Sequence, residues 1–481
     1  MKIDVFVSAP SRTWQGRIVE RLRDAGHSVA VIPSERPTPV QPTIGGALAL
    51  ERAVLRRPLA LLASTTIDTA SPRAGADLTL DLSGERRGRM SIAFDGSADD
   101  RTLFAALAQG RLPELEIVLD GKSFDSALPM VDNRAFIATA AEDVLARAVT
   151  LTVRAVARYA AGERDGVPLQ PAPSAPSFLA AYLGSSLPRL GREIARRSRY
   201  RFAHWRVGYR LIDGPGIAET DDIGSAWQVL PDDGSHFYAD PFAFEHEGKA
   251  WIFVEDYAHA TGKAVISVSG LDAGGIAQTP VPVLEAPHHL SYPQVFRSGA
   301  DIFMLPEGSG SGKLTLYRAA HFPDRWEPVA DLLSGEISDA TLLARDDGFW
   351  LFATDRDGGG STSDTLVVFH APALTGPWTP HRQNPILIDR RRARPGGAII
   401  ERHGRLLLPV QDGTLGYGGG LGLSEVEQLD ANAVRLSTPH PINPAGDFPY
   451  PQIHTLNRAG RLEVIDGIAA VRKAHALSKA S

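Results

Sequence analysis

Two patterns of hydrophobic and polar positions divide the chain. Up to about residue 165, short apolar runs alternate with amphipathic stretches whose apolar residues recur at helical spacing. The predicted strands are IDVFVSA (3–9), SVAVIP (28–33), LALLAS (59–64), DLTLDLS (77–83), MSIAFDG (90–96) and ELEIVLDG (114–121). The predicted helices are WQGRIVERLRDAGH (14–27), ALALERAVLRR (47–57) and IATAAEDVLARAVTLTVRAVARYAA (137–161). This alternation predicts an α/β domain over residues 1–165 with a doubly wound, parallel sheet.

Residues 166–204 separate the two patterns. The prolines of VPLQPAPSAPSF (167–178) are typical of an interdomain linker. SLPRLGREIARRSRYRF (186–202) follows and predicts a basic helix. Its arginines could meet anionic lipid or nucleic acid, or form a solvated face beside a domain junction, which is the simpler interpretation.

From residue 205 to about 475, short strands alternate with Gly, Pro and Asp turns, and one hairpin recurs five times. The copies are DPFAFEHEGKAWIFVED (240–256), YPQVFRSGADIFMLPE (292–307), DATLLARDDGFWLFATD (339–355), RPGGAIIERHGRLLLPVQD (394–412) and YPQIHTLNRAGRLEVID (450–466). Their starts lie 52, 47, 55 and 56 residues apart. A multi-stranded repeat of this length is typical of propeller blades, so we predict an all-β, five-bladed β-propeller over residues 205–475.

Propeller geometry predicts which residues share one mouth. The first strand of each blade lines the channel and the second runs antiparallel to it, so the starts of first strands meet the ends of second strands. The predicted inner ring is Asp240, Tyr292, Asp339, Arg394 and Tyr450. The predicted outer ring is Asp256, Glu307, Asp355, Asp412 and, in a looser alignment, Asp466. Acids therefore gather at one mouth of a chain whose net charge is only −6, which predicts a polar pocket.

The acids of this mouth suggest glycosidic chemistry. Making or breaking a glycosidic bond needs one protonated and one ionised carboxyl group facing the same cavity. Asp240, Asp339 and Glu307 are the candidates. The alternative is that acids at strand ends bond the backbone N–H groups of neighbouring turns.

Histidines form a second cluster near the strand starts. They are His236, His288, His289 and His454. We expect them to contact sugar hydroxyls or to act as general acid, with structural hydrogen bonding as the alternative. Neither an HxH nor an HxxxH spacing occurs, so no metal site is predicted.

Arginines, aromatic residues and an amide complete the predicted site. Arg392 and Arg394, in DRRRARPGG (389–397), could clamp a phosphate or carboxylate of a sugar donor, or form a salt bridge between blades. The tyrosines Tyr238, Tyr292, Tyr417 and Tyr450 could stack on sugar rings, and Gln411 and Asp412 would add polar contacts. The glycine-rich GTLGYGGGLGL (413–423) lies between strands and predicts a flexible rim loop rather than a phosphate loop.

Composition excludes several classes of protein. The absence of cysteine excludes disulfides, thiolate zinc sites and cysteine nucleophiles. Mild acidity argues against nucleic acid as the main partner. No apolar run approaches the ~20 residues needed to span a bilayer, and no export signal is evident, so we expect a cytoplasmic protein. The first strand–helix turn, SAPSRTWQG (8–16), lacks GxGxxG, and no cofactor is predicted. The sequence indicates no oligomeric state.

Phrases of the second pattern carry two resemblances. ADPF and the DAT of the third hairpin resemble the five-bladed propeller glycosidases, which implies a base or nucleophile role for Asp240 and an orienting role for Asp339. Those enzymes take their general acid from a Glu that opens a later blade, where this chain has Arg394. Glu307 could substitute only if it reaches inward.

A more extensive resemblance covers residues 205–420. FYADPFAF, HHLSYPQVF, RRARPGG and LLLPVQDGTLGYG are similar to the propeller at the N-terminus of glucosamine inositolphosphorylceramide transferases. This implies a role in building a surface glycan or glycolipid, with a sugar or activated sugar as substrate and peripheral contact with a glycolipid acceptor. The residues 1–165 resemble a formyltransferase, a Rossmann-like fold, but RRGRMSIAFDGS (86–97) has no Asn-x-His. The resemblance therefore implies a degenerate domain that is inactive in formyl transfer.

These observations favour a glycosyltransferase-like enzyme acting at the propeller mouth. Asp240 would be base or nucleophile, Asp339 an orienting acid, Glu307 or His289 the proton donor, and Arg394 the clamp for an anionic group. Two alternatives stay open: a glycoside hydrolase with paired carboxylates, and a glycan-binding or scaffold module without catalysis.

Overall fold

The computed structural model describes residues 1–37, 41–56, 58–85, 88–169, 177–201, 203–450 and 452–473. These residues form two compact units, one of residues 1–195 with 358–361 and the other of residues 196–357 with 362–481. Most of the proline-rich stretch predicted as a linker, residues 170–176, lies outside the described residues.

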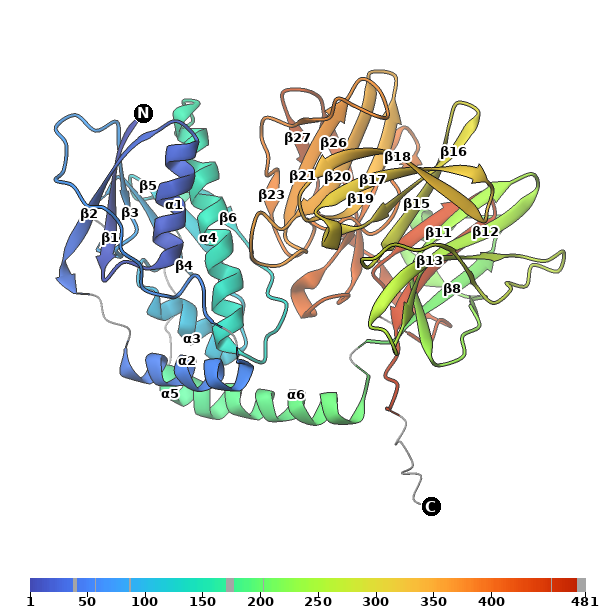
Figure 1. Ribbon diagram of the computed structural model, residues 1–481, viewed down its shortest axis with the longest axis horizontal. Helices are drawn as coiled ribbons and strands as arrows, with labels where there is room; N and C mark the ends of the chain where they lie inside the picture. The colour runs from blue at the N-terminus through green and yellow to red at the C-terminus, as the bar shows by residue number, and fades with distance from the viewer. Residues whose placement is uncertain are drawn as a thin grey trace, which may run out of the picture. The chain divides into compact units, whose positions relative to one another are not determined.

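The first unit is an α/β fold built on one seven-stranded sheet (Figure 1). Its strands are β1 (Lys2–Ala9), β2 (Ser28–Pro37), β3 (Leu78–Asp81), β4 (Met90–Phe94), β5 (Leu115–Leu119), β6 (Lys122–Ala127) and β7 (Val167–Pro168). Its main helices are α1 (Thr13–Asp24), α2 (Pro42–Leu55), α3 (Arg101–Gln109) and α4 (Ile137–Ala160). The segment α5 (Phe178–Ala181), the π-helical turn η1 (Tyr182–Ser186) and α6 (Leu187–Arg199) follow.

The prediction of a wholly parallel sheet is wrong. In the order β2-β1-β3-β4-β5-β6-β7, the first four strands are parallel, but β5, β6 and β7 each pair antiparallel. A short turn joins β5 directly to β6, as antiparallel neighbours allow, whereas helix α3 lies in the connection between β4 and β5. The predicted strand 59–64 is also absent. Its carbonyls at Leu61 and Ala63 instead accept the N–H groups of Trp14 and Thr13 at the start of α1.

The second unit is a five-bladed β-propeller, as predicted. Blade one has β11 (His236–His246), β12 (Lys249–Ala258), β13 (Lys263–Gly270) and β14 (Val281–Leu284). Blade two has β15 (Ser291–Ser298), β16 (Asp301–Glu307), β17 (Lys313–His321) and β18 (Arg325–Ser334). Blade three has β19 (Ile337–Arg345), β20 (Gly348–Asp355), β21 (Thr365–Ala371), β22 (Thr379–Pro380) and β23 (Leu387–Ile388). Blade four has β24 (Ile400–Arg402), β25 (Arg405–Gln411), β26 (Leu421–Leu429), β27 (Val434–Leu436) and β28 (His440–Pro441).

Blade five closes the ring with strands from both ends of the unit. Its order is β10-β8-β31-β30, with β8 (Trp205–Leu211) and β10 (Gln228–Val229) from the first residues of the propeller and β30 (Leu456–Ala459) and β31 (Leu462–Ile468) from the last. The short helix α7 (Ile217–Thr220) and the strand β9 (Asp222–Gly224) lie between β8 and β10 in sequence. β9 pairs in parallel with β29 (Asn443–Gly446), which precedes β30 in sequence. Closure leaves no blade without a neighbour, which removes the open edges that invite aggregation.

The hydrophobic core lies between blades rather than in one centre. Phe242 and Phe253 of blade one pack with Tyr292 and Met304 of blade two, and similar clusters join each later pair of blades. Blades five and one share a cluster that includes Tyr209. Each blade thus buries both faces only against its neighbours, which fixes their positions around the channel.

Candidate active site

Backbone bulges turn the inner-ring side chains toward the mouth. In β11, β15 and β19 the pairing register shifts where Asp240, Tyr292 and Asp339 sit. All three residues have positive φ, between 47° and 48°. This left-handed conformation is unfavourable for a residue other than glycine, and it recurs at one place in three blades. Such strain is typical of positions where a bulge re-aims a side chain beside a functional site.

Asp240 lies at the centre of one polar network. The side chain of Asp240 is 3% exposed, and its Oδ1 accepts a hydrogen bond from Thr455 Oγ1 at 3.1 Å while lying 3.3 Å from His454 Nε2. The Asp240 N–H donates to Asp466 Oδ2. Oδ2 of Asp240 accepts no hydrogen bond from the residues that the structure describes. One oxygen of a buried carboxylate is therefore left for a ligand.

Burial and neighbouring charges raise the pKa values of both Asp240 and His454. Burial raises the pKa of Asp240 to about 7, against the opposing charge of His454. Burial alone would lower the pKa of His454, but Asp466, whose Oδ1 lies 2.8 Å from Nδ1, and Asp240 raise it to about 9. His454 is thus an imidazolium at neutral pH, with one carboxylate at each nitrogen. An Asp with a pKa near 7 suits a general base.

The same three side chains place oxygen and nitrogen atoms within 4.8 Å of one another, close enough to hold a metal ion. Both ring nitrogens of His454 already face carboxylates, and Asp466 Oδ1 also accepts the N–H groups of His454 and Thr455. A metal would have to displace an imidazolium that satisfies both acids. The chemistry of the group therefore fits an ion-paired histidine.

Asp339 and Arg394 form a second network. Nε and Nη2 of Arg394 donate to the two oxygens of Asp339 at 2.5 and 3.0 Å, and Gln411 Nε2 donates to Asp339 Oδ2 at 2.7 Å. Nη1 of Arg394 donates to Thr362 and Ser363. The predicted clamp for an anionic group is therefore committed to protein acceptors, and Arg394 is the buried counter-ion of Asp339.

Glu307 reaches inward but is satisfied by the protein. Its oxygens accept hydrogen bonds from Ser309, Ser338 and the Asp339 N–H, and Arg394 Nη2 lies 3.6 Å away. Burial would raise the pKa of Glu307, but the Arg394 charge and these hydrogen bonds hold it below its ordinary value. An acid that stays ionised is a poor proton donor.

Glu255 and His289 form a further pair of charged side chains near the mouth. His289 Nε2 lies 3.2 Å from Glu255 Oε1, while its Nδ1 accepts the Ala264 N–H. Burial opposes the protonated ring, but the hydrogen bond and charge of Glu255 raise the pKa of His289 overall. Because its side chain is 42% exposed, His289 can reach a bound ligand. Sequence reasoning chose His289 but not Glu255.

Glu255 was missed because the outer ring was predicted one residue out of register in blades one, three and four. Glu255 pairs with Ala239 as Glu307 pairs with Ser291, each just before the bulged residue. The equivalent positions in blades three and four are Thr354 and Gln411. A one-residue offset moves a strand's side chains to the opposite face. Alignment from the bulged residues, rather than from the carboxylates, would have found Glu255.

The offset explains where the structure puts three predicted acids. Asp256 lies 2.6 Å from His236 Nδ1 and accepts from Ser267, Asp355 accepts the Asp357 N–H, and Asp412 accepts the Thr414 N–H. All three therefore hold their own blades and turns, and His236 is held with Asp256.

Five further predicted residues lie in supporting positions. Tyr238 packs in the cluster between blades five and one. Tyr292 is fully buried, with its hydroxyl between Thr341 and the Gly397 N–H. Arg392 bonds Asp389 and the carbonyls of Leu436 and Ser437. Tyr450 packs on Phe448, and His288 lies beside Gly308.

Aromatic rings cover the His454 side of the mouth. Trp205 stacks on His454 with ring centroids 3.9 Å apart, and Tyr417 meets both rings edge-on. Tyr417 is 51% exposed, and the Arg394 guanidinium lies 5.3 Å from its ring centroid. The glycine-rich rim loop thus presents an aromatic face beside the buried acids. Trp205 belongs to β8, so its place at the mouth depends on closure of the ring.

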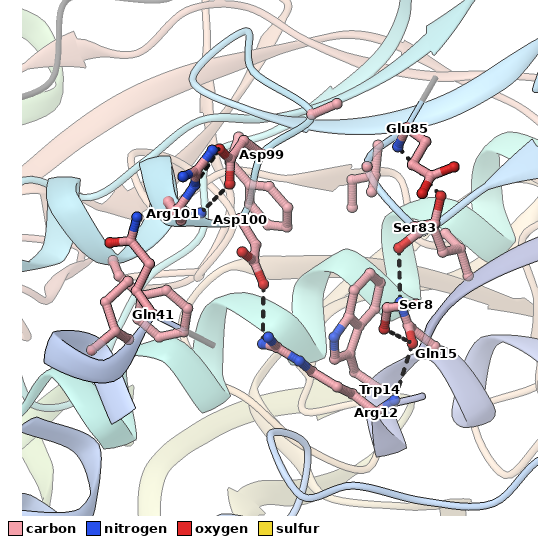
Figure 2. A pocket seen from close by; sticks show the side chains of 17 residues that line it. Ser8, Arg12, Trp14, Gln15, Gln41, Ser83, Glu85, Asp99, Asp100 and Arg101 are labelled. Atoms are coloured by element: carbon pink, nitrogen blue, oxygen red, sulfur yellow. Dashed lines mark hydrogen bonds and ion pairs between the residues drawn. The ribbon is translucent and has the colours of Figure 1, made fainter. Parts of the chain in front are cut away.

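The first unit contains a separate cavity of about 330 Å³ (Figure 2). It lies where β1, β3 and β4 end, next to the point where the chain order reverses around β1, a frequent ligand position in open α/β sheets. Arg12 is paired with Asp100 at 3.0 Å, and Gln15 bonds Ser8. Among the described residues that line it there is no histidine or asparagine.

Fold and site together define a five-bladed β-propeller with a carboxylate-lined mouth. Residues 221–438 match the family model of the N-terminal domain of glucosamine inositolphosphorylceramide transferase 1, which confirms the resemblance seen in the sequence. The rice (Oryza sativa subsp. japonica) transferase of that name is 34% identical over 220 residues, 43% of this chain and 30% of the relative. The Arabidopsis thaliana transferase is 31% identical over 205 residues, 42% and 27% of the two chains. The chain thus spans less than a third of these relatives.

Solved structures similar to the propeller include two glycoside hydrolases. A thermostable family-43 glycoside hydrolase has a TM-score of 0.35 and 10% identity, over 46% of this chain and 83% of its own. An α-L-arabinanase from Cellvibrio cellulosa has a TM-score of 0.32 and 17% identity, over 43% and 78%. In the described part of the chain, no helix has the length and apolar character needed to cross a bilayer.

Proposed function

We propose that the propeller mouth binds a sugar and carries out glycosyl transfer in the assembly of a surface glycan or glycolipid. The observation that carries this proposal is the carboxylate of Asp240. It is buried, its residue has a strained backbone conformation, its pKa is raised to about 7, and no described residue donates a hydrogen bond to its Oδ2. A sugar hydroxyl would complete its hydrogen bonding and lie against a base poised near neutral pH.

In this proposal the proton donor is His289 rather than Glu307. Glu307 is ionised and fully bonded, whereas His289 is half exposed and its pKa is raised by Glu255. Asp339 and Arg394 are positioning residues, because their charges neutralise one another inside the wall of the mouth. Asp240 as base and His289 as acid would form an acid–base pair whose environments set their protonation states.

The charges of the mouth favour a neutral or amino-substituted sugar over a sugar phosphate. Among the residues that the structure describes, the carboxylates of Asp240, Glu255, Glu307, Asp339 and Asp466 pair with three cationic side chains, those of Arg394, His454 and His289. Each nitrogen of Arg394 donates at least one hydrogen bond to a protein acceptor, so this guanidinium is already committed and would bind a phosphate poorly. An activated donor would then keep its phosphates outside the mouth.

The matched relatives support a glycan role of this kind. They are named glucosamine inositolphosphorylceramide transferase 1, and the residues of this chain that match the family model, 221–438, lie in its propeller. We extend only the chemistry of sugar binding and transfer to this chain, and propose a glycolipid as the acceptor.

For the first unit, we propose a degenerate, formyltransferase-like domain without formyl transfer. Its cavity offers no histidine or asparagine among the described lining residues. Arg12 is paired with Asp100, and the first N–H groups of α1 bond the carbonyls of Leu61 and Ala63. Among the described lining residues, a phosphate group would therefore find Arg12 and Arg101 already paired with aspartates and the start of α1 already bonded.

A glycan-binding module without catalysis is the second candidate. It is favoured by Arg394, which stands where the propeller glycosidases have their acid, and by the satisfied state of Glu307. Both features remove a carboxylic proton donor while leaving the sugar-facing surface intact.

Turnover and binding, measured on the same variants, test the proposal. The purified full chain is incubated with neutral oligosaccharides, amino-sugar oligosaccharides and nucleotide-activated sugars, and products are identified by mass spectrometry. We expect turnover that falls by about 10²–10⁴ in Asp240→Asn. The matched control is Asp301→Asn, an exposed residue at the hairpin end of blade two, which should keep the wild-type rate.

Each other result has a defined meaning. Binding that survives Asp240→Asn, with no turnover by the wild type, would establish the glycan-binding module. Turnover that needs only water as acceptor would establish a hydrolase. Full activity in Asp240→Asn would overturn the assignment of the mouth as catalytic.

A further inference from the structure

The helical segment of residues 178–199 carries an exposed apolar stripe. Leu179, Leu183, Leu187 and Ile194 are 46%, 55%, 38% and 57% exposed. They follow one another at four, four and seven residues, through α5, η1 and α6, so they lie along one side of the helical path. Leucines and isoleucines normally bury such surface, and a run of four along one helical side is more than scattered exposure.

The opposite side of the segment is attached to the first unit. Phe178, Ala181 and Tyr182 are buried, and Ser186 Oγ donates to the Ala108 carbonyl. Arg189 donates to the Leu107 carbonyl. The stripe therefore points away from the side that holds the segment in place.

The segment is also the most basic stretch of an otherwise acidic chain. Residues 187–201 contain six arginines and one glutamate, a net charge of +5, while the whole chain has a net charge of −6. Within α6 no residue is buried, and Arg192, Arg197 and Arg199 are exposed. Basic residues beside an exposed apolar stripe characterise helices that lie in the plane of a membrane surface.

We propose that residues 178–199 dock this protein on an anionic lipid surface. The apolar stripe would enter the boundary between headgroups and acyl chains, and the arginines would meet lipid phosphates. A second copy of the chain fits this surface less well, because two stripes could meet only by bringing two segments of charge +5 together. Nucleic acid would engage the arginines but leave the stripe in water.

This docking would hold the propeller near lipid-linked acceptors, but it does not depend on the proposed glycosyl transfer. The surface consists of stripe residues that all belong to the first unit, together with arginines of α6. None of the residues of the propeller mouth takes part. The two proposals can therefore fail separately.

Vesicle flotation with the full chain tests the docking. The probes are vesicles of phosphatidylcholine alone and vesicles of equal parts phosphatidylcholine and phosphatidylglycerol. We expect binding to the anionic vesicles only, weakened by salt, and about tenfold weaker for Leu187→Glu/Ile194→Glu. The matched control is Val281→Glu/Val329→Glu, two exposed valines of β14 and β18 that add the same charge.

A second variant and a second measurement separate docking from folding and self-association. Brominated lipid in anionic vesicles should quench the tryptophan fluorescence of Leu187→Trp more than that of the wild type, which already has seven tryptophans. The melting temperature of Leu187→Trp should equal that of the wild type. Absence of wild-type binding to anionic vesicles would overturn the proposal, as would equal binding by the two double variants. If Leu187→Glu/Ile194→Glu converts an oligomer to a monomer in sedimentation velocity, the stripe is an interface between copies of the chain instead.

Discussion

At the residue scale, the described carboxylates of the mouth outnumber its cationic side chains, and this imbalance shifts their pKa values. His454 sits between Asp240 and Asp466, and Arg394 between Asp339 and Glu307. Each cation is buried with two acids, so the proton on Asp240 becomes the remaining means of balancing charge. Burial therefore raises the pKa of Asp240, because the nearby cations do not fully offset the cost of burying its negative charge.

The pKa of His454 makes a prediction about stability. Its folded value of about 9 lies above the ordinary 6.5, so the stabilisation is complete below pH 6.5 and is lost as pH rises through 9. The gap between these pKa values corresponds to about 3 kcal/mol. We expect the melting temperature of the propeller to fall between pH 7 and 9, and Asp466→Asn to reduce that fall because Asp466 is the main cause of the raised pKa.

Tryptophan fluorescence can follow this melting, because six of the seven tryptophans lie beyond residue 204, in the propeller. Asp301→Asn, exposed and far from His454 in sequence, should keep the wild-type pH dependence. An equal fall in wild type and Asp466→Asn would show that His454 is not responsible.

Tyr417 makes a prediction about binding. Its half-exposed ring is held edge-on by Trp205 and His454, so it is fixed before a ligand arrives. Tyr417→Ala should weaken sugar binding roughly tenfold by calorimetry, and Tyr417→Phe should restore it, because stacking uses the ring and not the hydroxyl. Leu415→Ala, on the same loop and 76% exposed, is the control. A loss in Tyr417→Phe equal to that in Tyr417→Ala would assign the role to the hydroxyl instead.

The sequence allowed Asp240, Asp339 and Arg394 to be placed together, because each opens a copy of the same hairpin. The sequence did not allow the hydrogen-bond partners of Arg394 and Glu307 to be predicted, because these partners, which include Thr362 and Ser338, belong to other blades. Glu255 could have been found, but only by locating the bulges first.

At the element scale, β8 is the part of the fold that sequence reasoning placed least well. The five hairpins predicted five blades, which is correct, but they do not include residues 205–211, which form β8. Its partner β31 could not be read from the repeats, because pairing between segments so distant in sequence leaves no local signal. The parallel sheet predicted for the first unit failed for a related reason, since alternation alone does not reveal that β5 reverses direction.

A buried ion pair joins β8 to β31 where the ring of blades closes, and its removal is the basis of the next prediction. Arg210 of β8 donates to Glu463 of β31 at 2.9 and 2.6 Å, and Glu463 also accepts the Ile217 N–H. Glu463→Gln should destabilise the propeller by about 3 kcal/mol, because it leaves the Arg210 charge buried without its partner. The measurement is denaturant unfolding followed by tryptophan fluorescence.

The matched control for this change is Glu401→Gln, an exposed glutamate of β24. It should alter stability by less than about 0.5 kcal/mol. Equal effects of the two substitutions would mean that blade five is held by its hydrogen bonds and apolar contacts alone.

At the scale of the whole molecule, the propeller contains every partner of its own ring. Blade five is completed by β8 and β10, which belong to the same unit as the other four blades. We therefore expect a fragment of residues 196–473 to unfold in one cooperative transition, at the temperature of the tryptophan transition in the full chain. Aggregation of the fragment, or a much lower melting temperature, would show that the first unit stabilises the ring.

Ring closure by β8 also sets the order in which the molecule can be completed during synthesis. Arg210 and Glu463 are 253 residues apart, so the ribosome makes one partner long before the other. At about 5–20 residues per second, β8 waits on the order of tens of seconds for β31 while four blades form beside it. During that interval the growing chain exposes the edge of β8 that later pairs with β31. If synthesis ended after blade four, the propeller would lack β30 and β31 and could not close.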